Sequence, residues 1–219
     1  MTDPVERDAA AILRYWFSSL DDGASLEPGA EPFRTHYARW YGKEPEIDDQ
    51  IRERFEPMLK ATLQGGAQWA SRLDAWSRAP KGLLALVILL DQLPRNMYRD
   101  SPAMYAHDPL ALVVAAEAIR QYADADLALV QRMFLYVPLM HAESATLQQM
   151  MVGHFEALVG MAAERSPHNL RFFEFALEYA RRHCDVVERF GRFPHRNAIL
   201  GRSSTAEELE FLSRDGSTF

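Results

Sequence analysis

The sequence predicts an all-helical protein, and three observations lead to that class. Apolar residues recur at helical spacing in several stretches, prolines and glycines separate those stretches, and no β-strand alternation persists for more than a few residues. The chain has 219 residues, of which 48 % are hydrophobic and 25 % charged, so it has room for a sizeable core. We therefore expect one domain over residues 1–219 with about nine helices.

The bulk properties exclude several classes of protein. A formal net charge of −7 argues against general nucleic-acid binding, and the single cysteine, Cys184, rules out an intrachain disulfide framework. The N-terminal MTDPVERD has acids where a signal peptide needs positive charge, and the longest apolar run, 83–90, is too short to span a bilayer. No glycine-rich phosphate loop or dinucleotide fingerprint occurs. The expectation is a soluble cytoplasmic protein with no cofactor and no membrane or nucleic-acid partner.

The N-terminal third predicts three helices. Each carries an apolar stripe at helical spacing, and Gly/Pro-rich or aromatic and turn-forming residues lie between them. The expected helices are 5–20, 47–63 and a short one around Trp69, Leu73 and Trp76, separated by the loop 21–35, the mixed stretch 36–46 and the pair Gly65-Gly66.

A central apolar run follows Pro80 and reads GLLALVILLDQ. It fits a buried helix better than a strand, because Leu and Ala outnumber β-branched residues and Pro80 suits a helix start. Pro94 is expected to end it, which places Asp91 in the last turn, where the helix dipole disfavours a carboxylate. A buried acid there needs a cation, and nearby arginines or those of residues 189–202 are expected to supply it.

The second half predicts five more helices, namely 109–123, 126–136, 138–164 opened by Pro138, 167–190, and a terminal helix capped by Ser203, Ser204 or Thr205. In the third of these, the expected apolar arc is centred on Leu139, Leu147, Met150, Met151 and Leu158. Glu143 and His154 fall inside that arc, so a carboxylate and an imidazole are expected to point inward. The apolar arc of 167–190 contains Cys184, which we interpret as a core residue.

The stretch 189–202, RFGRFPHRNAILGR, stands out in an acidic chain because it holds four arginines, one histidine and no acid. Apolar residues are interleaved throughout, which a solvated basic tail would not show. We expect a compact turn that buries aromatic rings and holds guanidinium groups in fixed positions. Two turns also resemble each other: 92–96 (QLPRN) and 192–197 (RFPHRN) both combine a proline with an Arg-Asn pair, and both are expected to follow a helix end.

Together, three segments define a candidate site. The ligand-binding candidates are Arg95, Asn96, Arg192, Arg196, Asn197 and Arg202, and the structural counter-charges are Asp91 and Glu143. Positive neighbours should lower the pKa of His195, so His195, together with His141 and Glu143, is a candidate for acid/base catalysis, the alternative being a structural hydrogen bond. The spacing of these side chains matches no metal-ligand pattern, so no metal site is expected.

The arginines in these segments leave two interpretations open. Six of them, at positions 95, 99, 189, 192, 196 and 202, face only Asp91 and Glu143, or three acids when Asp100 is included. The excess of cations allows a pocket for a small molecule that bears a carboxylate or phosphate, with or without enzymatic turnover. The alternative is a network of ion pairs that locks helix ends together.

Three blocks of the sequence resemble the signatures of one bacterial family, domain of unknown function 924. They are PKGLLALVILLDQLPRNMYRDSPAMYAHDPLAL (80–112), FLYVPLMHAES (134–144) and RFGRFPHRNAILGRSSTAEELEFL (189–212), and YWF (15–17) and WYGKEPEIDDQIRERF (40–55) also fit. The resemblance implies an all-helical fold related to tetratricopeptide repeats and carries no assigned activity or site residues. By analogy with such folds, the second hypothesis for function is an interaction module that binds an acidic peptide or C-terminus.

Overall fold

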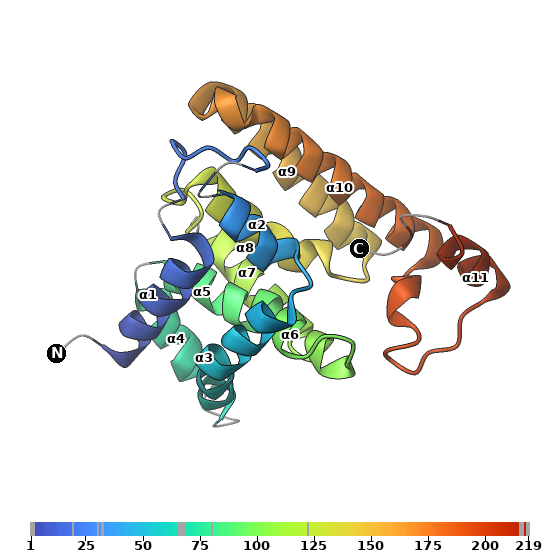
Figure 1. The fold of residues 1–219 in the computed structure, drawn as a ribbon, viewed down its shortest axis with the longest axis horizontal. Coiled ribbons are helices and arrows are strands. Elements are labelled where there is room, and N and C mark those ends of the chain that lie inside the picture. Colours follow the sequence, from blue (N-terminus) through green and yellow to red (C-terminus); the bar gives the residue numbers. More distant parts are fainter. Residues whose placement is uncertain are drawn as a thin grey trace.

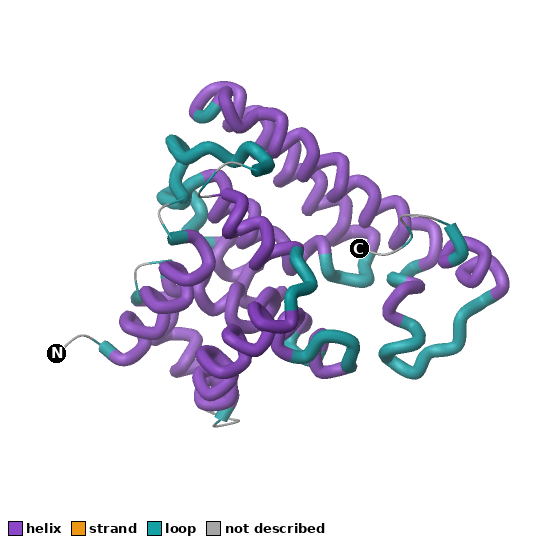
Figure 2. Tube along the Cα trace, viewed as in Figure 1, coloured by secondary structure: helices purple, strands orange, loops and turns teal. Residues whose placement is uncertain are grey.

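The computed structural model describes residues 3–18, 20–29, 31, 33–64, 69–79, 81–121, 123–214 and 217. All regular elements in these ranges are helical, as expected (Figures 1 and 2). The α-helices are α1 Pro4–Phe17, α2 Phe33–Tyr41, α3 Pro45–Leu63, α4 Trp69–Arg78, α5 Gly82–Val87, α6 Leu93–Met97, α7 Asp108–Arg120, α8 Leu129–Met140, α9 Ala145–Arg165, α10 Leu170–Phe190 and α11 Ala206–Leu212. Of these eleven, α5 and α6 are continuous, so the described ranges hold ten helices, close to the nine expected.

None of these helices is long and apolar enough to cross a membrane. The relation to tetratricopeptide repeats stays a prediction. The expected limits at Pro80 and at Gly65 and Gly66 lie outside the described residues.

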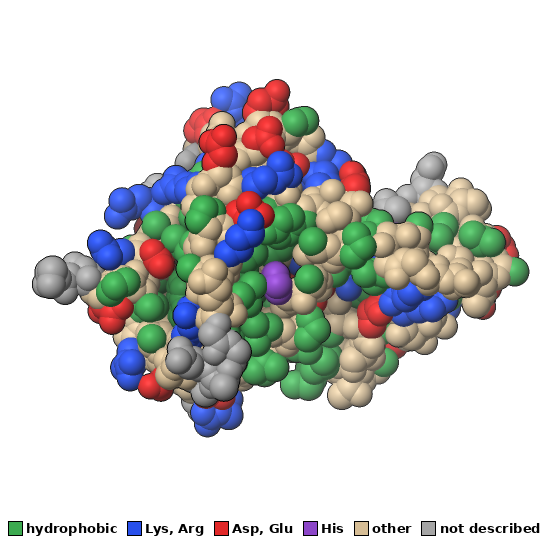
Figure 3. Space-filling view, turned by 90° about the horizontal axis from the view of Figure 1, so that it is seen from below, with side chains coloured by type: hydrophobic (Ala, Val, Ile, Leu, Met, Phe, Trp, Pro, Cys, Tyr) green, Lys and Arg blue, Asp and Glu red, His purple; other side chains and the backbone are tan. Residues whose placement is uncertain are grey.

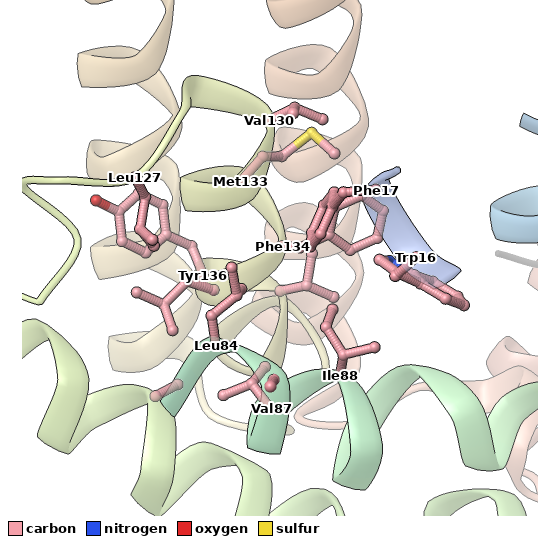
Figure 4. Close-up of a cluster of buried hydrophobic side chains, with 14 of the residues drawn as sticks. Trp16, Phe17, Leu84, Val87, Ile88, Leu127, Val130, Met133, Phe134 and Tyr136 are labelled. Carbon is pink, nitrogen blue, oxygen red and sulfur yellow. The ribbon is translucent and has the colours of Figure 1, made fainter. Parts of the chain in front are cut away.

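The core is built around α8, whose side chains pack against residues of α1 and α5 (Figure 4) and also against Trp40 of α2. The ring of Phe134 from α8 meets Trp16 and Phe17 of α1 and Trp40 of α2, with ring centroids 5.7, 5.5 and 4.7 Å away. These are edge-to-face contacts, the arrangement that aromatic quadrupoles favour. All four side chains are buried, and burying one large apolar side chain stabilises a fold by about 1.5–3 kcal/mol. Leu84, Val87 and Ile88 of the central helix complete the cluster (Figure 4).

Helix α2 was not predicted, because residues 21–35 and 36–46 were expected to be irregular. Phe33, His36 and Trp40 are its buried residues, and their spacing of three and four is that of one helical face. Phe33 packs edge-on against Phe172 of α10 at 5.4 Å. The helix is only nine residues long, so its stability comes from this packing rather than from its own sequence.

The prediction that Pro94 ends the central helix is wrong. After α5 the chain makes a π turn, Ile88–Gln92, and then continues as α6 to Met97. The π turn shifts the hydrogen bonding by one residue, and Pro94 enters near the start of the new α segment, where a missing N–H is tolerated. Asp91 therefore lies inside a continuous buried helix, and not in its last turn.

The break between α8 and α9 also lies at a different position from the one expected. Pro138 lies inside α8, and the chain turns at residues 141–144 instead. Gln148 fixes this break, since its side-chain amide donates to the carbonyls of Met140 and Ala142 at 2.6 and 2.8 Å. These bonds satisfy carbonyls at the end of α8 that have no helical partner. His141 and Glu143 thus belong to a turn, and the expectation that Glu143 points inward from a helix face is wrong.

The buried face of α9 differs from the apolar arc that was predicted for residues 138–164. Its buried residues are Gln148, Met151, Phe155, Leu158 and Ala162, whereas Met150 is 52 % exposed. His154, expected to point inward, is half-buried and stacks on Tyr136 with the ring centroids 4.4 Å apart.

Helix α10 lies antiparallel along α9 (Figure 1) and confirms its predicted stripe. The buried residues include Phe173, Leu177, Ala180, Cys184 and Val187. Burial also raises the pKa of Cys184 to about 11, so this thiol is protonated and unreactive near neutral pH, as its core position suggested.

Residues 191–212, which follow α10 and include α11, fold back beside the end of α10 (Figure 1). Gly191 ends that helix with φ +69°, a left-handed conformation that suits glycine. The expected capping of the terminal helix is confirmed at Thr205, whose hydroxyl accepts from the amide of Glu208 at 3.2 Å while the Glu208 carboxylate accepts from the amide of Thr205 at 2.7 Å. Phe193 anchors the segment, fully buried against Val186 and Val187.

A close approach of α5 to α4 can be tested at Gly82. A Cβ on Gly82 would lie 2.0 Å from the carbonyl oxygen of Trp76, so we expect Gly82→Ala to lower the free energy of unfolding by about 1–3 kcal/mol. Gly153 in α9 is the matched control, because a Cβ there meets nothing within 4 Å, and Gly153→Ala should raise stability by about 0.5–1 kcal/mol. Urea unfolding followed by circular dichroism measures both changes; equal stability of Gly82→Ala and the parent would contradict this packing.

Candidate functional site

The three segments predicted to converge do lie together. Glu143, in the turn between α8 and α9, forms a two-point ion pair with Arg202 at 2.6 and 2.9 Å and accepts the backbone amide of Phe193 at 2.8 Å. Burial alone would raise the pKa of Glu143, but the Arg202 and Phe193 hydrogen bonds hold it below its usual value. His141 lies in the same turn, and its Nδ1 is 2.8 Å from Oδ1 of Asp91. This contact links the turn to the π turn of the central helix.

Most of the arginines find acids that the sequence count left out. Arg189 pairs with Glu207 and Arg192 with Glu208, both from the first turn of α11. Arg99 makes a two-point contact with Asp48 of α3, at 2.7 and 2.9 Å. These acids lie in the first turns of α3 and α11, outside the segments in which the acids were counted, so the inferred excess of six cations over three acids is wrong.

The two candidate asparagines are also engaged by the chain. Asn96 donates to Asp48 at 2.8 Å, beside Arg99. Asn197 donates to the hydroxyl of Ser204 at 3.0 Å and accepts from Arg202 at 2.9 Å. Both amides are buried, so they act here as ties between segments.

Asp91 is the buried centre of the remaining cluster, with an exposed fraction of 0 %. One carboxylate oxygen faces His141 Nδ1 at 2.8 Å and Arg95 Nη1 at 3.5 Å, and the other accepts from the amide of Gln92. Burial by itself raises the pKa of Asp91, yet Arg95 and His141 together hold it below its ordinary value. The carboxylate is therefore ionised at neutral pH, and His141 must donate its Nδ1 proton to it.

Two arginines from the two similar turns converge on one carboxylate, Asp108 in the first turn of α7. Arg95 binds Asp108 in a two-point contact, 3.0 Å for each N–O pair. Arg196 approaches the same carboxylate from the other turn, with Nη1 only 3.5 Å from Oδ2. The result is a chain of alternating groups that runs His141, Asp91, Arg95, Asp108 and Arg196.

Arg196 differs from the other arginines of the site. Its side chain is only 8 % exposed, yet its guanidinium makes no hydrogen bond to any residue that the structure describes, and Nε is completely enclosed. Two aromatic rings lie against it, with the guanidinium carbon 4.7 Å from the Tyr105 centroid and 4.5 Å from that of Phe193. Burial, and then repulsion from Arg95, lower the pKa of Arg196.

Three imidazoles surround this chain of charges. Burial lowers the pKa of His195 to about 4, with Arg196 as the next cause, which confirms the expected direction although burial is the larger effect. Burial likewise lowers the pKa of His183 to about 3 and, with repulsion from Arg95, that of His141. All three are neutral at pH 7. A neutral imidazole beside a guanidinium suits acid/base chemistry.

His183, Tyr105 and Asp108 were missed from the sequence. His183 falls three residues after Ala180 on the buried stripe of α10, so its helical spacing held a signal. Asp108 had no distinguishing signal, because an acid in the first turn of a helix is ordinarily explained by the dipole.

Two depressions of the described surface lie away from this cluster. One of about 360 Å³ is lined by Tyr15, Glu31, Arg34, Thr35, Ala38, Arg39, Ile47 and Gln50, and one of about 190 Å³ by Val5, Asp8, Ala61, Thr62, Ser71, Arg72, Ala75 and Trp76. Neither touches the cluster around Arg196. Figure 3 shows one face of the molecule, where apolar side chains surround a visible histidine and charges lie mainly toward the edges. Within the described residues, no three His, Cys, Asp or Glu side chains are grouped to hold a metal ion.

Comparison with known proteins gives a family and no activity. The solved structure of a protein of unknown function, ATU0120 from Agrobacterium tumefaciens, is 34 % identical and superposes with a TM-score of 0.69 over 94 % of this chain and 96 % of that one. No curated protein matches. The model of the family described as bacterial protein of unknown function (DUF924) matches residues 12–216. The chain therefore belongs to the DUF924 family.

Proposed function

We propose that this protein binds a small molecule carrying a carboxylate or phosphate, and that Arg196 is the residue that holds the anion. The observation that supports this is a buried guanidinium without hydrogen bonds to the described chain. An arginine has five N–H donors, and removing its charge from water costs several kcal/mol unless a partner compensates. The protein supplies such partners to Arg95, Arg99, Arg192 and Arg202.

The surroundings of Arg196 favour a ligand over an internal partner. The nearest acid, Asp108, is already bound at both oxygens by Arg95, and it stands 3.5 Å from Arg196. Tyr105 and Phe193 shield the planar group from water but accept no strong hydrogen bond from its edge. An incoming oxyanion would take the in-plane N–H groups in a two-point contact. The side chains of Arg95 and Asp108 retain 18 and 16 % exposure, so small solutes reach this cluster.

The acidic-peptide hypothesis has less support. Arg189, Arg192 and Arg202, the more exposed arginines of the C-terminal segment, are paired with Glu207, Glu208 and Glu143 of the same chain. A peptide carboxylate would have to displace those acids.

The test is anion binding by the parent protein and by Arg196→Gln. Calorimetry and thermal shifts with phosphate and short carboxylates, at ionic strength held constant with chloride, should show saturable binding to the parent. A ligand at 100 times its dissociation constant adds about 2.7 kcal/mol of stability, and Arg196→Gln should lose this gain. Arg189→Gln changes the charge equally at an exposed ion pair of the same segment, and it should respond as the parent does. An unresponsive parent, or an undiminished response in Arg196→Gln, would contradict the proposal.

A further inference from the structure

The chemistry of the site also restricts which anions it accepts. His141 is the group that matters, because its two ring nitrogens have different roles. Nδ1 donates to the ionised carboxylate of Asp91 at 2.8 Å, so the neutral ring carries an unshared electron pair on Nε2. No residue in the described part of the chain hydrogen-bonds to Nε2, and the side chain is 15 % exposed.

Asp91 holds that arrangement in place. Its carboxylate is fully buried, and its second oxygen accepts from Gln92, so it has a fixed orientation and stays charged. A carboxylate on Nδ1 determines the tautomer and orients the ring, as it does for many functional histidines. His141 therefore presents a hydrogen-bond acceptor, in a fixed direction, inside a cluster that otherwise presents donors.

His141 and Arg196 stand at the two ends of the chain of alternating charges, and both ends lie beside the same imidazoles. Two residues after His141, the carboxylate of Glu143 accepts from the backbone amide of Phe193 at 2.8 Å, and the Phe193 ring lies 4.5 Å from the guanidinium carbon of Arg196. His195 adjoins Arg196 in sequence, and its ring lies 5.6 Å from that of Phe193, which also covers Arg196. The acceptor atom Nε2 of His141 and the donor groups of the Arg196 guanidinium thus border one small region between the 141–144 turn and the C-terminal segment.

We infer that the ligand at this site is an anion that also carries an O–H donor, such as hydrogen phosphate or an α-hydroxy carboxylate, with the anion on Arg196 and the hydroxyl on His141 Nε2. This inference rests on the proposed function. Sulfate and propionate offer only acceptor oxygens at neutral pH, and one of these would face the electron pair of Nε2. Sites with a fixed hydrogen-bonding partner discriminate strongly against analogues that lack the matching group.

Calorimetry with two matched pairs of ions tests the inference. Phosphate is compared with sulfate, and lactate with propionate, at pH 7.5 and constant ionic strength. We expect at least one of the hydroxyl-bearing ions to bind at least tenfold more tightly than its partner, and the better pair identifies the phosphate or the hydroxy-acid source. In His141→Asn the amide can still donate to Asp91 while the Nε2 acceptor is gone, so the preference should shrink to less than threefold.

The outcomes separate the inference from the function on which it rests. If sulfate binds as tightly as phosphate and propionate as tightly as lactate, the site binds anions but His141 does not read the hydroxyl, and the inference fails alone. A tenfold preference that persists in His141→Asn also overturns it. If none of the four ions binds the parent protein, both the inference and the proposed function are contradicted. Circular dichroism of His141→Asn checks the fold, and His141→Ala, which also removes the acceptor and is tested for the same loss of preference, is the second variant if Asn unfolds.

Discussion

Replacing Asp91 by alanine is expected to lower the free energy of unfolding by about 3–5 kcal/mol, the largest effect of any substitution considered. The carboxylate is completely buried and holds His141, Arg95 and Gln92 around it. Without it, Arg95 keeps Asp108 and the backbone carbonyl of residue 91 but loses a buried counter-charge, and two further donors lose their acceptor inside the core. Buried donors and charges that lose a partner cost far more than the net value of the original contact.

Urea unfolding at several pH values measures this effect. The pKa of Asp91 is lower in the folded than in the unfolded protein, so its contribution is fully present above the unfolded pKa of about 3.9 and is lost as the pH falls through the folded value. The difference between parent and Asp91→Ala should therefore be full at pH 7 and shrink in strong acid. Glu207→Ala, at an exposed ion pair, is the control and should change stability by less than about 1 kcal/mol. A loss below that size for Asp91→Ala would mean that the cluster does not hold the central helix.

The helices that the sequence predicts well are those whose evidence is local. The stripe of α10 and the capping box at Thr205 each depend on residues within one or two turns, and the structure confirms both. The errors occur at Pro94 and Pro138, where a local rule was applied to a helix whose continuation is decided elsewhere. In α8 the surrounding core holds the helix through Pro138, and the break comes where Gln148 can cap it.

The candidate site shows the same division between local and long-range evidence. The convergence of three charged segments could be predicted because each carries unusual residues in an apolar context. The ion pairs inside the cluster could not be predicted, because Arg99 pairs with an acid 51 residues away in the sequence and Arg202 with an acid 59 residues away. An acid such as Asp108 also has an ordinary explanation in its own helix. Only the folded arrangement shows that Arg95 uses both oxygens of Asp108 and that no described residue forms a hydrogen bond with the Arg196 guanidinium.

Replacing Arg196 by methionine is expected to raise the free energy of unfolding by about 1–2 kcal/mol and to abolish anion binding. The substitution removes a buried cation that no described residue hydrogen-bonds, and it leaves the Arg95–Asp108 contact complete. Methionine is shorter than arginine but also unbranched and flexible, and its sulfur packs well against aromatic rings such as Tyr105 and Phe193. Urea unfolding in the absence of anions measures the gain, and calorimetry with phosphate and lactate measures the loss of binding.

The matched control is Arg95→Met, at the other arginine that contacts Asp108. Arg95 compensates the buried carboxylate of Asp91 and the partly buried carboxylate of Asp108, so Arg95→Met should lose about 3 kcal/mol of stability where Arg196→Met gains stability. Both arginines contact Asp108, so opposite changes in the free energy of unfolding would distinguish their roles. A loss of stability in Arg95→Met would mark Arg95 as a structural residue, and a gain in Arg196→Met would mark Arg196 as a residue kept for a ligand. Binding residues commonly cost stability in the unliganded protein, because their partners arrive only with the ligand. If both variants are destabilised alike, Arg196 is a structural residue, and its missing hydrogen bonds no longer argue for an anion.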